Sequence, residues 1–220
     1  MGLRAGLSVD RSGEVRHLGT DDRTATRVRV VDGALRCYAR QGLQRTTLDH
    51  VAQEAGVSRA TLYRNFPGGK DAVLAAVVET EAARFFSALA VVMGEAHDLE
   101  DVLVAGMVAA ARRLADHEAL GSLLAHEPGV VLRHLAFDGL DHLLAAAAGF
   151  SAPFFRRWLA PDQAARAAEW AVRIVLSYLT SPAEGTDLAD PEQARHLVST
   201  FVIPGIQALR MVDEPRGKER

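Results

Sequence analysis

The chain has 220 residues, 49% of them hydrophobic, and a formal net charge of −3 at neutral pH. This composition suffices for a buried core, but no run of about 18 uncharged apolar residues predicts a membrane-spanning helix. The N-terminus lacks the apolar stretch of a secretion signal, and Cys37 is the only cysteine, which excludes an intramolecular disulfide. We therefore expect a cytoplasmic protein without membrane contact.

The net charge conceals a division along the chain. Residues 23–70 contain nine Arg or Lys and three Asp or Glu, a net charge of +6, whereas residues 71–220 have a net charge of −8. A basic first quarter joined to an acidic remainder indicates two tasks, one of which is contact with a polyanion.

The first predicted helix follows an N-terminal segment without hydrophobic periodicity. Residues 1–21 mix glycine, serine and charges, which is typical of a disordered tail. From residue 22 onward, apolar side chains such as Val28, Val31 and Leu35 recur at helical spacing. Gly42 is expected to end this helix.

Two short helices are predicted next, within residues 46–69. Thr46 and Asp49 have the spacing of a capping box at the start of a helix, and Gly56 suits the left-handed conformation that often ends one. Ser58 is expected to cap the next helix. Three helices with a glycine in the turn between the second and third describe a helix-turn-helix domain over residues 22–69.

Helical patterns continue to residue 211. The expected helices span residues 71–93, 99–116, 118–126, 129–149, 161–180 and 190–211. No stretch alternates with the period of a strand, so we expect an all-α fold, in which the helix-turn-helix domain precedes a larger helical domain over residues 70–211. Residues 212–220 are expected to form a flexible tail.

The third short helix carries the side chains of a DNA reader. Arg59 can pair with guanine through two hydrogen bonds, the Thr61 hydroxyl can contact either kind of base edge, and Ala60 can touch a thymine methyl group. Phosphate contacts are expected from Tyr63, Asn65 and Lys70. Phe66, in contrast, is expected to belong to the core.

The segment "RTTLDHVAQEAGVSRATLYRNFPGGKDAVLAAVV" resembles the N-terminal domain of the TetR family of transcriptional repressors. The resemblance implies a DNA-binding protein and not an enzyme, with a variable helical domain for effector binding and dimerisation. It places DNA contacts at Thr47, Ser58, Arg59, Ala60, Thr61, Tyr63, Asn65 and Lys70. The sequence departs from the family in one place, because Lys70 follows Phe66 by four residues where three are usual.

The larger domain is expected to bind a small apolar effector of unknown identity, such as a lipid, a steroid or a multi-ring aromatic molecule. Large apolar side chains and a few polar anchors supply this candidate pocket. Its expected residues are Met107, Leu124, His126, His134, Phe137, Phe154 and Trp158.

A dimer is expected because one small domain has too little interface for tight, specific DNA binding, whereas two linked domains can bind a palindromic operator. Wide apolar stripes on the last two helices could face a partner. The expected interface residues are Ala168, Val172, Val175, Leu179, Val198, Phe201 and Val202. Pro204 is expected to kink the final helix.

Alternative functions remain open at this point. No motif of a hydrolase, metalloprotease or phosphate-binding loop occurs, and neither a catalytic residue nor a cofactor is expected. His134, Asp138 and His142 lie on one helix face with spacing that could hold a metal ion, but we expect a solvated polar face there and no metal site. A DNA-binding protein without an effector, or an activator, also fits the sequence.

Overall fold

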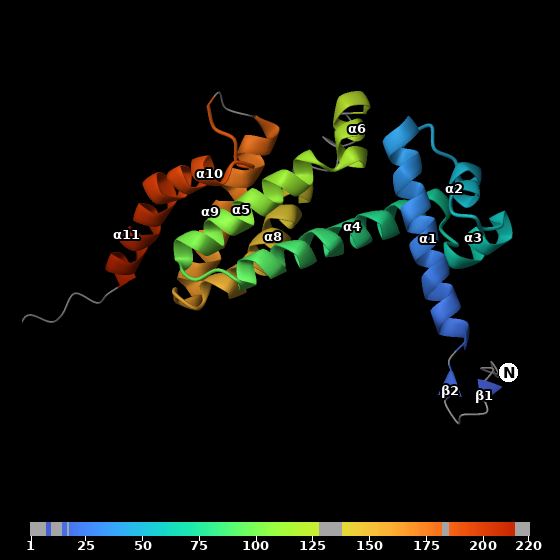
Figure 1. The fold of residues 1–220 in the computed structure, drawn as a ribbon, viewed down its shortest axis with the longest axis horizontal. Helices are drawn as coiled ribbons and strands as arrows, with labels where there is room; N and C mark the ends of the chain where they lie inside the picture. The colour runs from blue at the N-terminus through green and yellow to red at the C-terminus, as the bar shows by residue number, and fades with distance from the viewer. Residues whose placement is uncertain (1–7, 10–14, 17, 128–137, 182–184, 214–220) are drawn as a thin grey trace, which may run out of the picture. The chain divides into compact units, whose positions relative to one another are not determined.

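The computed structural model describes residues 8–9, 15–16, 18–127, 138–181 and 185–213 (Figure 1). It confirms the all-α class. Two two-residue strands, β1 (Ser8–Val9) and β2 (Val15–Arg16), pair antiparallel within the segment that was expected to be a disordered tail. The helices are α1 (Leu18–Gln41), α2 (Leu48–Glu54), α3 (Arg59–Asn65), α4 (Gly69–Gly94), α5 (Leu99–Ala115), α6 (Glu118–His126), α8 (Asp138–Phe155), α9 (Pro161–Thr180), α10 (Pro191–Leu197) and α11 (Ile203–Asp213), with a π-helical turn η1 (Val198–Val202).

The chain divides into two compact units. The N-terminal unit comprises residues 1–82 and 118–128, and the C-terminal unit comprises residues 83–117 and 129–220. This division differs from the expected domains, since α6 belongs to the N-terminal unit although its sequence neighbours α5 and α8 belong to the C-terminal unit. The long helix α4 continues through the boundary.

The core of the N-terminal unit is formed where α1, α2 and α3 meet. Val30, Val51, Leu62 and Phe66 are almost completely buried. At Gly33, an added Cβ would lie 3.0 Å from the backbone nitrogen of Ala55, so the absence of a side chain permits α1 and α2 to approach closely. Figure 1 shows α2 and α3 beside α1 in this unit.

The predicted ends of the short helices are confirmed by local geometry. Gly42, directly after α1, has φ +81°, and Gly56, after α2, has φ +62°. The Ser58 hydroxyl accepts a hydrogen bond from the Thr61 amide at 3.1 Å and thereby caps α3. These three residues fix the turn that separates α2 from α3 and the loop that separates α1 from α2.

Helix α6 is attached to the N-terminal unit by packing and by hydrogen bonds. It packs against α1, and Ala119 on α6 is buried. Just after α6, the Glu127 carboxylate accepts a hydrogen bond from the Gln44 amide at 3.2 Å in the α1–α2 loop. An added Cβ at Gly42 would clash with the same carboxylate. These contacts explain why the segment separates from its sequence neighbours.

The C-terminal unit is a helical bundle in which α8 and α9 pack along each other and both contact α5. Its core contains Val102, Leu103, Phe155 and Val198. Arg195 on α10 forms ion pairs with Glu100 at 2.9 Å and Asp101 at 3.0 Å at the start of α5. The final helical stretch is interrupted by η1 immediately before α11, whose second residue is Pro204.

None of the helices in the described residues has the length and apolar character needed to cross a membrane.

Candidate nucleic-acid interface

The third helix, α3, presents a polar face on a buried apolar support. Leu62 and Phe66 are 0% and 1% exposed, while Arg59, Ala60 and Tyr63 are exposed. The alternation arises because residues 62 and 66 are one helical turn apart and therefore share a face. Three of the side chains expected to contact DNA are thus exposed on a short, capped helix.

Arg59 is held by two neighbours. Its Nη1 atom lies 3.2 Å from Oδ2 of Asp49, in the first turn of α2, and its guanidinium carbon lies 5.7 Å from the centroid of the Tyr63 ring. A hydrogen bond with Tyr63, followed by the negative charge of Asp49, raises the pKa of Arg59. Asp49 was not expected in the site. Its one signal in the sequence is an acidic side chain within a segment of net positive charge.

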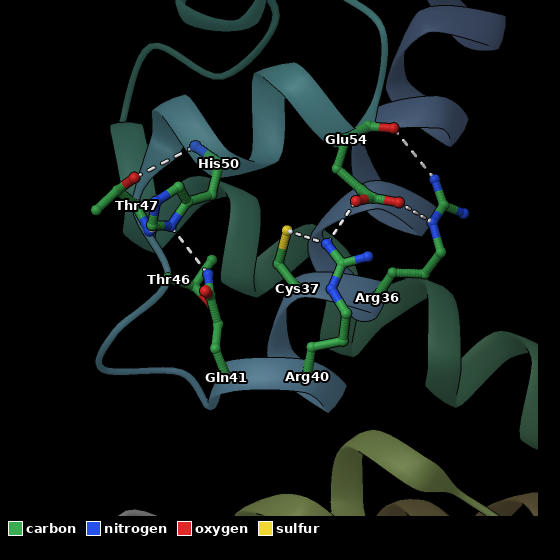
Figure 2. Close-up of polar contacts among 8 residues, drawn as sticks. All are labelled: Arg36, Cys37, Arg40, Gln41, Thr46, Thr47, His50 and Glu54. Carbon is green, nitrogen blue, oxygen red and sulfur yellow. Dashed lines mark hydrogen bonds and ion pairs between the residues drawn. The ribbon is translucent and has the colours of Figure 1, made fainter.

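The capping box of α2 lies one residue later than expected. Thr47, not Thr46, is the N-cap, and its hydroxyl accepts a hydrogen bond from the His50 amide at 3.2 Å. His50 Nδ1 accepts in return from the Thr47 amide at 3.4 Å and is 2.9 Å from Nε2 of Gln41 (Figure 2). Thr46 is instead buried, where its hydroxyl donates to the Gly42 carbonyl at 2.7 Å. Thr47 is therefore exposed at the start of α2.

A second polar cluster joins α1 to α2. Arg36 and Arg40 both form ion pairs with Glu54, and Figure 2 shows the two guanidinium groups turned toward its carboxylate. Hydrogen bonds from Arg40 and then Arg36 lower the pKa of Glu54. Beside this cluster lies a polar groove of about 450 Å³, lined by Arg40, Gln41, His50, Gln53 and Glu54. Its polar lining differs from the apolar effector pocket that the sequence predicts.

Asn65 requires a correction to its expected role as a phosphate contact. The residue is only 4% exposed, and its Nδ2 atom donates to the Thr61 carbonyl at 2.8 Å, within α3. Arg27 from α1 donates to the Asn65 carbonyl at 2.8 Å. Asn65 therefore closes the end of α3 against α1 and offers no side-chain donor to the surface.

Lys70 is the second residue of α4, and its Nζ atom donates to the Gln44 carbonyl at 3.3 Å. Gly69, which precedes it, has φ +65° and accommodates the additional residue between Phe66 and Lys70. The ammonium group is thus held at the α1–α2 loop by a single contact to a backbone oxygen.

The expected pocket residues are only partly brought together. Met107 is buried in the core of the C-terminal unit, and Phe154 and Trp158 pack against that core. His126 is an exposed residue of the N-terminal unit, with Nδ1 3.0 Å from the Ser122 carbonyl. The side chain of Leu124, and His134 and Phe137 altogether, lie outside the described residues, as does the candidate metal stripe at His134.

The expected dimer stripe lies largely inside the C-terminal unit. Ala168, Val175, Val198 and Val202 are buried in its core, because α9, α10 and η1 cover one another or α5. Val172 is half-buried, and the side chain of Leu179 is outside the described part of the chain. Phe201, in contrast, is 72% exposed, as is 63% of Trp170 on α9. Helical spacing identified the apolar stripe but not which of its members the chain itself covers.

Comparison with known proteins agrees with the helix-turn-helix geometry. Residues 30–77 match the family of bacterial regulatory proteins described as the tetR family. The HTH-type transcriptional regulator Rv1255c of Mycobacterium tuberculosis is 29% identical over 84% of this chain and 90% of its own length. The regulator SrpR of Pseudomonas putida is 45% identical over 53 residues, which are 24% of each chain.

Solved structures share the fold. The TetR family repressor AlkX from Dietzia sp. has 24% identity and a TM-score of 0.60, over 83% of this chain and 95% of that chain. The regulator FadR from Bacillus halodurans has 20% identity and a TM-score of 0.52, over 80% of this chain and 96% of that one. Together with the helix-turn-helix of the N-terminal unit, these matches assign residues 30–77 to the DNA-binding domain of the tetR family of bacterial regulatory proteins, and they show that the chain shares the fold of TetR family repressors.

Proposed function

We propose that this regulator is a cytoplasmic repressor that binds a palindromic operator as a dimer and is released by a small apolar effector. The observation that carries the DNA-reading part is the exposed face of α3. Arg59, Ala60 and Tyr63 project from a helix whose other face, Leu62 and Phe66, is anchored in the core. A rigid support of this kind lets short side chains reach base edges in the major groove at fixed positions.

The experiment that tests this function is selection of bound duplexes from random DNA by the full-length protein. We expect enrichment of a palindrome whose two half-sites are separated by about one helical turn or a multiple of it. We assign base contacts in each half-site to Arg59 and Thr61, and phosphate contacts to Thr47, Tyr63 and Lys70. A protein that enriches no sequence in this selection is not a sequence-specific regulator.

A second copy of the chain is the proposed partner of the exposed aromatic side chains of the C-terminal unit. Trp170 and Phe201 are exposed on α9 and η1, which both belong to the expected dimerisation domain. Large apolar side chains left in water favour association, and aromatic residues are enriched at the centres of interfaces.

Replacing Phe201 with glutamate is expected to convert the dimer to a monomer, because the substitution would bury an unpaired charge at the interface. Light scattering of the wild-type protein at micromolar concentration should give twice the 23.7 kDa chain mass, and the variant should give the single chain mass. Val91→Glu is the matched control, since Val91 is a similarly exposed apolar residue of the same unit, on α4. A monomeric wild-type protein, or a Phe201→Glu variant that remains dimeric, contradicts this interface.

An apolar effector is supported by half-buried aromatic side chains in the C-terminal unit. Phe86, Phe150 and Phe154 form a row, with ring centroids 4.6 Å and 5.4 Å apart, and Trp158 packs against the adjoining core. Helix α4 connects this unit to the N-terminal unit, so a change in its position offers a route from effector to DNA.

Reciprocal coupling is the expected signature of such an effector. A compound that releases DNA must bind the operator complex more weakly than the free protein by the same factor, typically 5- to 150-fold. A panel of long-chain and multi-ring apolar compounds can be titrated with and without operator by calorimetry. Compounds that bind with equal affinity in both conditions would show that ligand binding and DNA binding are independent.

A further inference from the structure

We propose that Asp49 determines the specificity of the DNA-binding unit by orienting Arg59 and by weakening the binding of duplexes in which Arg59 finds no matching base. This inference rests on the proposed function, since it assigns a role within the same DNA-reading surface. Asp49 is an acidic residue at a place where contact with DNA alone would favour a basic or neutral one.

The geometry supplies the orienting part. Asp49 comes from α2 and Arg59 from α3, and the 3.2 Å ion pair joins the two helices across their turn. Tyr63, one turn further along α3, contacts the same guanidinium group from another direction. An arginine has five N–H donors, so one nitrogen can remain on Asp49 while the other donors are available to a guanine edge. Because these two neighbours already restrict the Arg59 side chain in the free protein, Arg59 loses less conformational entropy when it binds DNA.

Charge supplies the discriminating part. Residues 23–70 contain three acidic side chains, Asp32, Asp49 and Glu54, and Glu54 is already paired with two arginines of α1. Asp49 instead forms its ion pair with Arg59, on the exposed surface of α3 that is proposed to contact bases. On an unrelated duplex, the attraction of Arg59 to phosphates is therefore offset by a nearby carboxylate. On the operator, the uncharged acceptors of guanine can be bound without breaking the ion pair, so affinity is retained.

A purely structural role for Asp49 is the competing explanation, since an acidic residue in a first helical turn stabilises the helix dipole. The capping box of Thr47 and His50 already satisfies amide groups at the start of α2. Asp71 provides a matched control, because it is an exposed acidic residue in the first turn of α4 and has the same effect on net charge when replaced.

The test compares wild-type protein, Asp49→Asn, Asp49→Glu and Asp71→Asn for binding to the selected operator and to a scrambled duplex over a range of salt concentrations. We expect Asp49→Asn to bind the scrambled duplex about tenfold more tightly. The slope of log affinity against log salt concentration should also become steeper, by about the amount that one additional phosphate contact contributes. Operator affinity should stay constant or fall, so the ratio of the two affinities should fall at least tenfold. Asp49→Glu, which can still reach Arg59, should keep most of the ratio, and Asp71→Asn should keep all of it.

Combining Asp49→Asn with Arg59→Ala tests whether the effect passes through the arginine. Without Arg59, loss of the carboxylate should strengthen operator and scrambled binding equally, so the ratio no longer depends on residue 49. An operator preference that Asp49→Asn retains in full overturns the role of Asp49 alone. A wild-type protein with no operator preference overturns the proposed function and this inference with it.

Discussion

Replacing Phe66 with alanine is expected to destabilise the N-terminal unit by about 3–5 kcal/mol, the usual cost of removing a buried aromatic side chain. The ring is 1% exposed at the end of α3, and the guanidinium carbon of Arg27 lies 4.5 Å from its centroid. A unit of this size has a total stability of only ~5–15 kcal/mol, so the loss is a large fraction of it. Operator binding should fall in proportion to the unfolded fraction.

Hydrogen exchange measured by mass spectrometry can follow the two units separately in the full-length protein. We expect faster exchange in α1, α2 and α3 of the Phe66→Ala variant. Val78→Ala is the control, because an apolar side chain of the same unit is removed from a position that is 61% exposed and the core is left intact. Equal stability losses in the two variants would show that burial of Phe66 does not support the reading helix.

Replacing Arg59 with alanine is expected to weaken operator binding by about 1–3 kcal/mol and to relax the sequence preference at one base pair in each half-site. The effect should be local, because the Arg59 side chain is 65% exposed and is not part of the core. Binding to a set of operators with each base pair changed in turn would identify the position that Arg59 reads.

Lys70→Ala serves as the contrasting variant. Its ammonium group is held by one hydrogen bond to the Gln44 carbonyl, and a phosphate contact from this position carries no sequence information. We expect weaker binding to all duplexes alike and a salt dependence reduced by about one charge. An Arg59→Ala variant that binds the selected operator as tightly as wild type would refute the assignment of the reading face.

Local chemistry made much of the helix-turn-helix predictable from the sequence. Gly42, Gly56 and Ser58 act through their own backbone or the next turn, and each ends or begins a helix as expected. The start of α2 was displaced by one residue, because Thr46 and Thr47 have equivalent side chains and only the loop geometry decides which of them faces the helix.

Tertiary contacts explain where prediction from the sequence failed. Asn65 follows the basic residues of α3, but its amide turns back to the Thr61 carbonyl and is buried by the approach of α1. Val198 and Phe201 both belong to an apolar stripe, yet one is buried and the other exposed, since the surrounding helices cover only part of it. Such differences depend on neighbours far away in the chain and leave no local signal.

The placement of α6 has a consequence for the exchange of modules between regulators. A chimera that takes residues 1–82 from this protein and the remainder from a relative would acquire a foreign helix against α1 and lose the Glu127 carboxylate at the Gln44 amide. The donated segment would keep every side chain that is proposed to contact DNA. It would lose the contacts that hold the loop between α1 and α2 in place. Recombination that transfers DNA specificity intact therefore has to carry two separate pieces of the gene, the second of which encodes residues 118–128.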